Sequence, residues 1–329
     1  MSELTRVAID DLALAAIEPG FKGGYVLDAF PLLGGIVEIP ALVVAGRRPG
    51  PTLMAVAAVH GNEYEGQEAV RHVFARLDPD GLRGRYLAIP VCNVFAYESR
   101  SRCTPPHLDG LNLARVFPGR VDGSPTVRLA YHLMELVRRT LGPEDLFVDF
   151  HSASEDSNYL TMVGFRDIPS PGREASEEAA RHFGGCPLWR FGNQHGMFNA
   201  EVSRLGIPTV GTETTGQAGC RPEDVRVFAN GLWNLLRYRG MLDDGPPPRD
   251  DGPVHTGIEV MAGATGFLRA HFPLGTDVEA GQPVGEVIDH FGSRLAEVRA
   301  PRDGRIWMQR TIPAVRADET ACILGVPAT

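Results

Sequence analysis

The chain has 329 residues, 43% of them apolar and 22% charged, a composition typical of a globular protein with room for a large and a small domain. Its formal net charge of −9 argues against nucleic acid and anionic membranes as partners, because binding phosphate requires a basic face. We expect a cytoplasmic protein, because the sequence shows no signal-peptide pattern, no apolar run long enough for a bilayer, and five cysteines without Cys-x-x-Cys spacing.

Predicted strands and helices alternate along most of the chain. Residues 1–30 show no clear period and are expected to be irregular, and a long polar loop is expected at 96–125, where such loops are usually functional. Apolar and β-branched runs predict strands, and apolar residues at helical spacing predict helices. In chain order these are strands at 35–45 and 53–58, a helix at 65–77, a strand at 85–91, a helix at 126–140, strands at 147–150 and 207–212, and a helix at 223–238. This alternation predicts an α/β domain with a mostly parallel sheet flanked by helices.

Two histidines stand where predicted strands end. His60 follows one apolar run with Glu63 three residues later, and His151 closes another apolar run. Open α/β sheets bind ligands at the carboxyl ends of their strands, and catalytic zinc sites commonly use two histidines and one glutamate. We predict that His60, Glu63 and His151 bind one Zn²⁺, with Asp149 as an outer partner that could orient His151. The alternatives are a capped helix start and a satisfied histidine at a sheet edge, and another divalent metal would also suit these ligands.

A further predicted strand ends at Glu213, directly before a glycine-containing turn. A carboxylate beside a metal-activated water can take its proton during attack on an amide and return that proton to the departing amine. We therefore predict Glu213 to be the general base and acid, the alternative being a solvated glutamate at a strand end. His195, in the variable segment 155–200, is left out of the catalytic set because a lone loop histidine is more often structural or solvated.

Four motifs together resemble a known enzyme family. His60-x-x-Glu63, His151 and Glu213 follow one another as in the succinylglutamate desuccinylase/aspartoacylase family, and residues 109–119 resemble its Asn-Arg-x-Phe-Pro-Gly segment. The resemblance covers roughly residues 35 to 240. It implies a zinc carboxypeptidase-like fold and a zinc-dependent active site.

The resemblance also gives roles to arginines of the long loop. Arg115 stands at the arginine of the family's Asn-Arg pair, which would bind a substrate carboxylate or stabilise an oxyanion. Ala114 replaces the asparagine of that pair, and Asn112 lies two residues earlier as a candidate substrate ligand. Arg102 best fits the family's arginine that polarises the scissile carbonyl, with Arg100 in reserve as a substrate ligand. The alternative is that these arginines are solvated side chains of a loop, without a role in substrate binding or catalysis.

The composition changes after the last predicted helix. Residues 243–253 are acidic and proline-rich, as expected of a linker between a catalytic α/β domain at 1–242 and a small all-β domain at 254–329. Parts of this β segment resemble half-motifs of the biotinyl/lipoyl barrel-sandwich fold, but it contains no lysine that could carry a cofactor. We expect it to border the active site and limit access, as the β-rich domain of the family does, rather than to carry a group.

Motifs and resemblance together predict a zinc-dependent hydrolase that cleaves the amide bond of a small N-acyl amino acid or N-acylated amine. Within the family, the length and the added β segment look most similar to N-acetyl-diaminobutyrate deacetylases. The expected partner is a small molecule rather than nucleic acid or membrane, and assembly into a homo-oligomer is left open. Two alternatives remain: a zinc carboxypeptidase acting on a peptide end, and a metal-free binding protein that kept the fold.

Overall fold

A computed structural model describes residues 4–328 of the chain. The strands of its large sheet are β1 (Thr5–Ala8), β2 (Lys22–Leu32), β3 (Gly35–Ala45), β4 (Arg48–Val56), β5 (Arg83–Ile89), β6 (Leu146–Phe150), β7 (Ser157–Tyr159), β8 (Met162–Arg166), β9 (Leu188–Phe191), β10 (Thr209–Glu213), β11 (Val254–Met261), β13 (Asp277–Val278), β16 (Gly304–Arg310) and β18 (Thr320–Pro327). Their order is β1-β2-β3-β5-β4-β6-β10-β8-β9-β11-β18-β16-β13, with β7 paired to β16. A smaller antiparallel sheet has the order β15-β14-β12-β17, from β12 (Gly266–Ala270), β14 (Pro283–Ile288), β15 (Arg294–Arg299) and β17 (Ala314–Val315).

The predicted α/β class with a smaller β part is confirmed, although the large sheet is mixed. Its parallel strands β5, β4, β6 and β10 lie side by side, while antiparallel pairs flank them. In this parallel set Val56 of β4 lies opposite Asp149 of β6, and Thr212 of β10 lies opposite Phe150. The carboxyl ends of β4, β6 and β10 therefore meet at one edge of the sheet, where parallel α/β sheets place their ligands.

Helices cover both faces of the large sheet. They are α1 (Glu65–Arg76), α2 (Val94–Glu98), α3 (Pro125–Thr140), α4 (Arg173–Phe183), α5 (Phe198–Arg204) and α6 (Pro222–Tyr238), with 3-10 turns at Ile9–Asp11, Leu14–Ala16 and Leu113–Arg115. Successive side chains of a strand point to opposite faces. Accordingly Met54 and Val56 pack in the core that contains α3 and α5, whereas Leu53 and Ala55 pack in the core that contains α1, α4 and α6.

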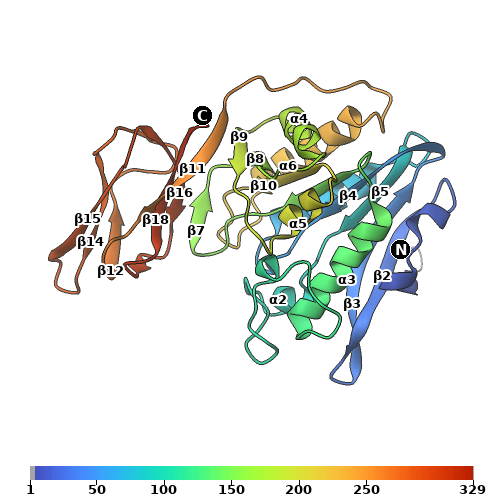
Figure 1. The fold of residues 1–329 in the computed structure, drawn as a ribbon, viewed down its shortest axis with the longest axis horizontal. Coiled ribbons are helices and arrows are strands. Elements are labelled where there is room, and N and C mark those ends of the chain that lie inside the picture. The colour runs from blue at the N-terminus through green and yellow to red at the C-terminus, as the bar shows by residue number, and fades with distance from the viewer. Residues whose placement is uncertain (1–3, 329) are drawn as a thin grey trace.

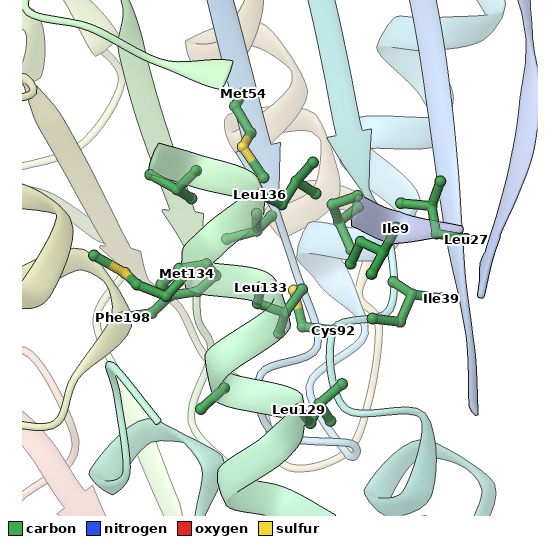
Figure 2. Close-up of a cluster of buried hydrophobic side chains, with 14 of the residues drawn as sticks. Ile9, Leu27, Ile39, Met54, Cys92, Leu129, Leu133, Met134, Leu136 and Phe198 are labelled. Carbon is green, nitrogen blue, oxygen red and sulfur yellow. The ribbon is translucent and has the colours of Figure 1, made fainter. Parts of the chain in front are cut away.

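Helix α3 illustrates how the sequence pattern produces this packing. Proline is tolerated at the first position of this helix, because a backbone N–H there would have no hydrogen-bond acceptor within the helix. Leu129, Leu133 and Leu136 recur on one face and are fully buried, and Figure 2 shows them among the buried side chains of this core. Burying each leucine side chain contributes roughly 1.5–3 kcal/mol, so this face fixes the helix against the sheet.

The C-terminal segment joins the large sheet directly. β11 pairs in parallel with β9 and antiparallel with β18, so the sheet continues from the α/β part into the last quarter of the chain. Figure 1 shows β11, β16 and β18 between the α/β part and the small sheet. Residues 243–253 contain neither helix nor strand, and Asp243 among them forms an ion pair with Arg48 at 2.7 Å. The division into a catalytic domain at 1–242 and a separate all-β domain at 254–329 stays a prediction.

The N-terminal prediction was wrong. Instead of an irregular segment, β2 spans Lys22–Leu32 and forms a long antiparallel ladder with β3. Gly23, Gly24 and Pro31 weaken the local strand signal of β2. Its hydrogen bonds to the next strand in the chain, β3, stabilise it despite this low strand propensity. In the predicted loop at 96–125, α2 ends at Glu98 and a 3-10 turn covers Leu113–Arg115, and the rest is irregular. Within residues 4–328, no helix is both long and apolar enough for a bilayer.

Candidate active site

The edge where β4 and β6 end carries a compact cluster of two imidazoles and one carboxylate. His60 Nδ1 lies 2.7 Å from Glu63 Oε1, and His151 Nδ1 lies 2.9 Å from Glu63 Oε2. All three side chains are buried, and one ligand atom from each lies within 4.8 Å of the other two. The sequence placed these residues at strand ends, and the structure brings them together.

The second ring nitrogen of each histidine faces an oxygen on the outer side of the cluster. His60 Nε2 lies 3.1 Å from Asn112 Oδ1, and His151 Nε2 lies 3.4 Å from Asp149 Oδ2. An acceptor at Nε2 favours the tautomer that carries its proton there and leaves Nδ1 with a lone pair for a metal. Two neutral imidazoles and one carboxylate, with outer oxygen partners, are a donor set that fits zinc.

Asn112 therefore contacts His60 and is not among the residues that line the cavity described below, and its role as a substrate ligand stays a prediction. Its side-chain oxygen also accepts the backbone N–H of Ala114 at 2.9 Å, which caps the 3-10 turn ending at Arg115. The carboxylate of Asp149 is fully buried, and no hydrogen-bond partner reaches either of its oxygens in the described part of the chain. Its Oδ2 lies 3.4 Å from His151 Nε2, a distance that suits the predicted outer partnership with His151.

Burial and charge act in opposite directions on the two histidines. Burial lowers the pKa of His60, and the nearby Glu63 only partly offsets this effect. Burial also lowers the pKa of His151, but Asp149 and Glu63 outweigh it and hold that pKa well above its ordinary value. Because a metal displaces the proton from its ligands, metal binding at this cluster should release protons.

Two arginines of the predicted loop lie beside the cluster or its cavity, and a third does not. Arg102 Nη1 lies 3.0 Å from Glu63 Oε1 and 2.5 Å from Ser154 Oγ, so its guanidinium is held against the proposed metal ligand. Arg115 is exposed, lines the cavity described next, and donates to the carbonyl of Ala114 at 2.9 Å. Arg100 is exposed and does not line the cavity described next.

A cavity of about 420 Å³ opens over the cluster. Its charged lining residues are Arg102, Arg115, Arg166, Arg190, Glu213 and Glu259, and its aromatic ones are Tyr159, Trp189 and Phe191. β11 and β18 contribute Thr256, Gly257, Glu259 and Ile323, so the C-terminal segment forms part of the wall. This volume lies within the range of pockets that hold small molecules.

Glu213 is the last residue of β10 and lines the same cavity as His60 and His151. Burial raises the pKa of Glu213 to about 7, with His151 and Arg102 opposing and Glu63 reinforcing the shift. A carboxylate with a pKa near neutrality is suited to taking and returning a proton at that pH. In contrast, the His195 side chain is 81% exposed and lies outside the cavity lining.

The sequence analysis missed Arg166 and Tyr159, which line the cavity from β8 and β7. Arg166 ends the apolar run Met162–Phe165, so it carries the same strand-end signal that identified His151. Tyr159 ends a strand of three residues that is too short for a periodic signal.

Three comparisons bear on this site. A sequence model of the succinylglutamate desuccinylase/aspartoacylase catalytic domain matches residues 49–239, more than half of the chain. The N-alpha-acetyl-L-2,4-diaminobutyric acid deacetylase of Halomonas elongata is 29% identical over 302 residues, covering 88% of this chain and 86% of that protein.

Solved structures agree with these matches. The product-bound ectoine utilization protein of Ruegeria pomeroyi superposes with a TM-score of 0.83 at 26% identity, covering 93% of this chain and 95% of that one. A succinylglutamate desuccinylase/aspartoacylase from Rhodobacter sphaeroides superposes with a TM-score of 0.83 at 26% identity, covering 94% of this chain and 95% of that one. The chain therefore belongs to the succinylglutamate desuccinylase/aspartoacylase family.

Proposed function

We propose that the protein is a zinc-dependent amidohydrolase that removes the acyl group from a small N-acyl amino acid. The observation that carries the proposal is the buried cluster of His60, Glu63 and His151, which opens on a cavity lined by Glu213. Family membership supports the same reading. The partner is a small molecule, and neither nucleic acid nor membrane is expected at this chain's net charge of −9.

Among N-acyl amino acids we favour an N-acetylated diamino acid. The support is the name of the Halomonas relative, which covers most of both chains. The cavity agrees with a small zwitterionic ligand, because it combines arginines with the carboxylates of Glu213 and Glu259.

In this proposal His60, Glu63 and His151 would hold the zinc ion, which supplies Lewis-acid activation of water and of the scissile carbonyl. Asn112 and Asp149 keep the two imidazoles in the orientation that ligation needs.

Glu213 accepts the proton of the attacking water and returns it to the nitrogen of the departing amine. The net change is hydrolysis: the carbon–nitrogen bond breaks, the acyl group leaves as a carboxylic acid, and the amino acid regains a free amine. Arg102, beside Glu63, is placed to stabilise negative charge that develops on the carbonyl oxygen.

The test measures amine release from Nα-acetyl-L-2,4-diaminobutyrate after the purified protein is stripped with a chelator and reloaded with zinc. We expect activity to be lost and then regained, and a His60→Ala variant to contain less zinc by elemental analysis. Equal zinc in both proteins would contradict the ligand assignment. Hydrolysis of peptide carboxyl ends in place of N-acyl amino acids would favour a carboxypeptidase, and zinc-independent binding without turnover would favour a binding protein.

A further inference from the structure

Arg166 is a buried cation that lies at the wall of the active-site cavity. It is the last residue of β8 and only 6% of its surface is exposed. Its Nε donates to Asn199 Oδ1 at 3.0 Å, its Nη1 donates to the carbonyl of Gly192 at 3.1 Å, and its Nη2 lies 3.1 Å from Met197 Sδ. All three acceptors are neutral.

The surrounding backbone leaves room for this arrangement. The guanidinium of Arg166 lies 4.9 Å from the centre of the Phe191 ring. A Cβ on Gly164 of β8 would lie 2.6 Å from that ring, and a Cβ on Gly211 of β10 would lie 2.9 Å from the side-chain nitrogen of Asn199. Glycine at these two strand positions thus permits the close approach of the ring and of the amide that hold Arg166.

The charge of Arg166 is not matched by a contacting carboxylate. No ion pair to Arg166 forms within residues 4–328, although Asp149 and Glu213 lie near enough to favour its charged form. Burial lowers the pKa of Arg166 to about 10, so the group remains cationic at neutral pH. A buried charge without a partner is costly, so a protein retains one mainly where an anion will reach it.

A second cation lines the same cavity. Arg115 donates to the carbonyl of Ala114, and it too forms no ion pair in the described residues. Arg102 and Arg190, the other two arginines of the lining, differ because they form ion pairs with Glu63 and Asp167. Arg115 and Arg166 are therefore the lining arginines best able to form an ion pair with an anionic ligand. Their planar guanidinium groups match the geometry of a carboxylate.

We propose that Arg166 binds the carboxylate of the substrate's amino acid, with Arg115 as the second cation of that site. The proposal rests on the proposed hydrolase function and adds a specificity-determining residue to it. The substrate class becomes N-acyl amino acids with a free carboxylate, and N-acyl amines without one become poor substrates.

The competing role for Arg166 is electrostatic support of Glu213 through the field of its charge. That role predicts a loss in turnover, which would be equal for substrates with and without a carboxylate. Carboxylate binding predicts instead a rise in the Michaelis constant that is confined to substrates with a carboxylate.

The experiment compares wild type, Arg166→Gln and Arg166→Lys on Nα-acetyl-L-2,4-diaminobutyrate and on its carboxamide. Arg173→Gln is the matched control, because Arg173 also lies beside a phenylalanine ring but outside the cavity. Zinc content and thermal melting report whether each variant keeps its fold. We expect Arg166→Gln to raise KM for the acid about 10- to 150-fold and to change KM for the carboxamide little. The zinc content of this variant should equal that of wild type. Arg166→Lys should recover part of the loss, because lysine keeps the charge but not the planar fork.

A binding measurement separates this proposal from the proposed function. Calorimetric titration of the acid into zinc-loaded Glu213→Gln, with Arg166 present or replaced by Gln, needs no turnover. Weaker binding after replacement supports the carboxylate site even if wild type hydrolyses neither probe, in which case only the hydrolase function falls. Equal binding in both backgrounds, or equal losses for acid and carboxamide, would overturn the role of Arg166.

Discussion

Replacing Glu213 by glutamine probes the proposed chemistry with little change in shape. The side chain lies at the end of β10 and lines the cavity together with His60 and His151. Glutamine keeps the volume and polarity of glutamate but has no basic oxygen to accept a proton. The zinc ligands belong to other elements, so metal content should not change.

The expected size of the effect follows from the role. Loss of a general base typically reduces turnover about 100- to 10,000-fold, which corresponds to roughly 2.7–5.4 kcal/mol in the activation barrier. The pH profile should change as well. Burial raises the pKa of Glu213 to about 7 in the protein without metal, and a bound cation would move that pKa downwards. Below this pKa the carboxyl is protonated and cannot accept a proton, so wild-type kcat/KM should fall as pH decreases between neutrality and the ordinary glutamate range.

The assay follows amine release across pH, with zinc content measured on the same samples. Glu144→Gln is the control, because Glu144 is an exposed glutamate outside the cavity lining. The control should keep wild-type turnover and the same fall of kcat/KM at low pH, which is the acidic limb of the pH profile. A Glu213→Gln enzyme that works within a few-fold of wild type, or that keeps the same acidic limb, would refute the assignment of the base.

Two further predictions concern the surroundings of the site. Asp149→Asn should weaken zinc binding about 10- to 100-fold, measured in competition with a chelator, because the partner of His151 loses its charge. The control Asp145→Asn, just before β6, should leave the zinc affinity unchanged. Equal zinc affinities of the two variants would show that Asp149 has no role at the metal site. Glu259→Gln should raise KM roughly 1.5- to 5-fold for a substrate with a side-chain ammonium, a small effect because exposed charge pairs are weak. The KM of an analogue with a neutral side chain should stay the same. Equal changes in KM for both substrates would show that Glu259 does not contact the substrate charge.

The sequence predicts the parts of the site that follow from local pattern. His60 and His151 end apolar runs, and the topology of parallel strands places such positions at one edge of the sheet. Spacing along the chain could not show that Asn112 faces His60, because that contact depends on how an irregular loop folds back over the sheet. The role of Asn112 as a substrate ligand stays a prediction.

The missed strand at the N-terminus has a different cause. β2 contains two adjacent glycines and a proline, so its propensity is low, and its stability comes from the ladder with β3. Arg166 was missed because an isolated arginine after a short apolar run usually faces solvent. Its burial depends on Asn199 and Phe191, which reach it from other elements.

One continuous sheet supplies both the proposed metal ligands and the mouth of the cavity. His60, His151 and Glu213 follow or end β4, β6 and β10. β9 pairs with β11, which contributes Gly257 and Glu259 to the lining of the same cavity. A Cβ on Gly257 would lie 2.6 Å from the Trp189 ring, so this part of the lining is closely packed. Because hydrogen-bonded strands fix the spacing of these lining residues, we expect the register of the sheet to limit substrate size together with the side chains that line the cavity. Changes that alter β9–β11 pairing should therefore affect specificity even though they lie outside the catalytic cluster.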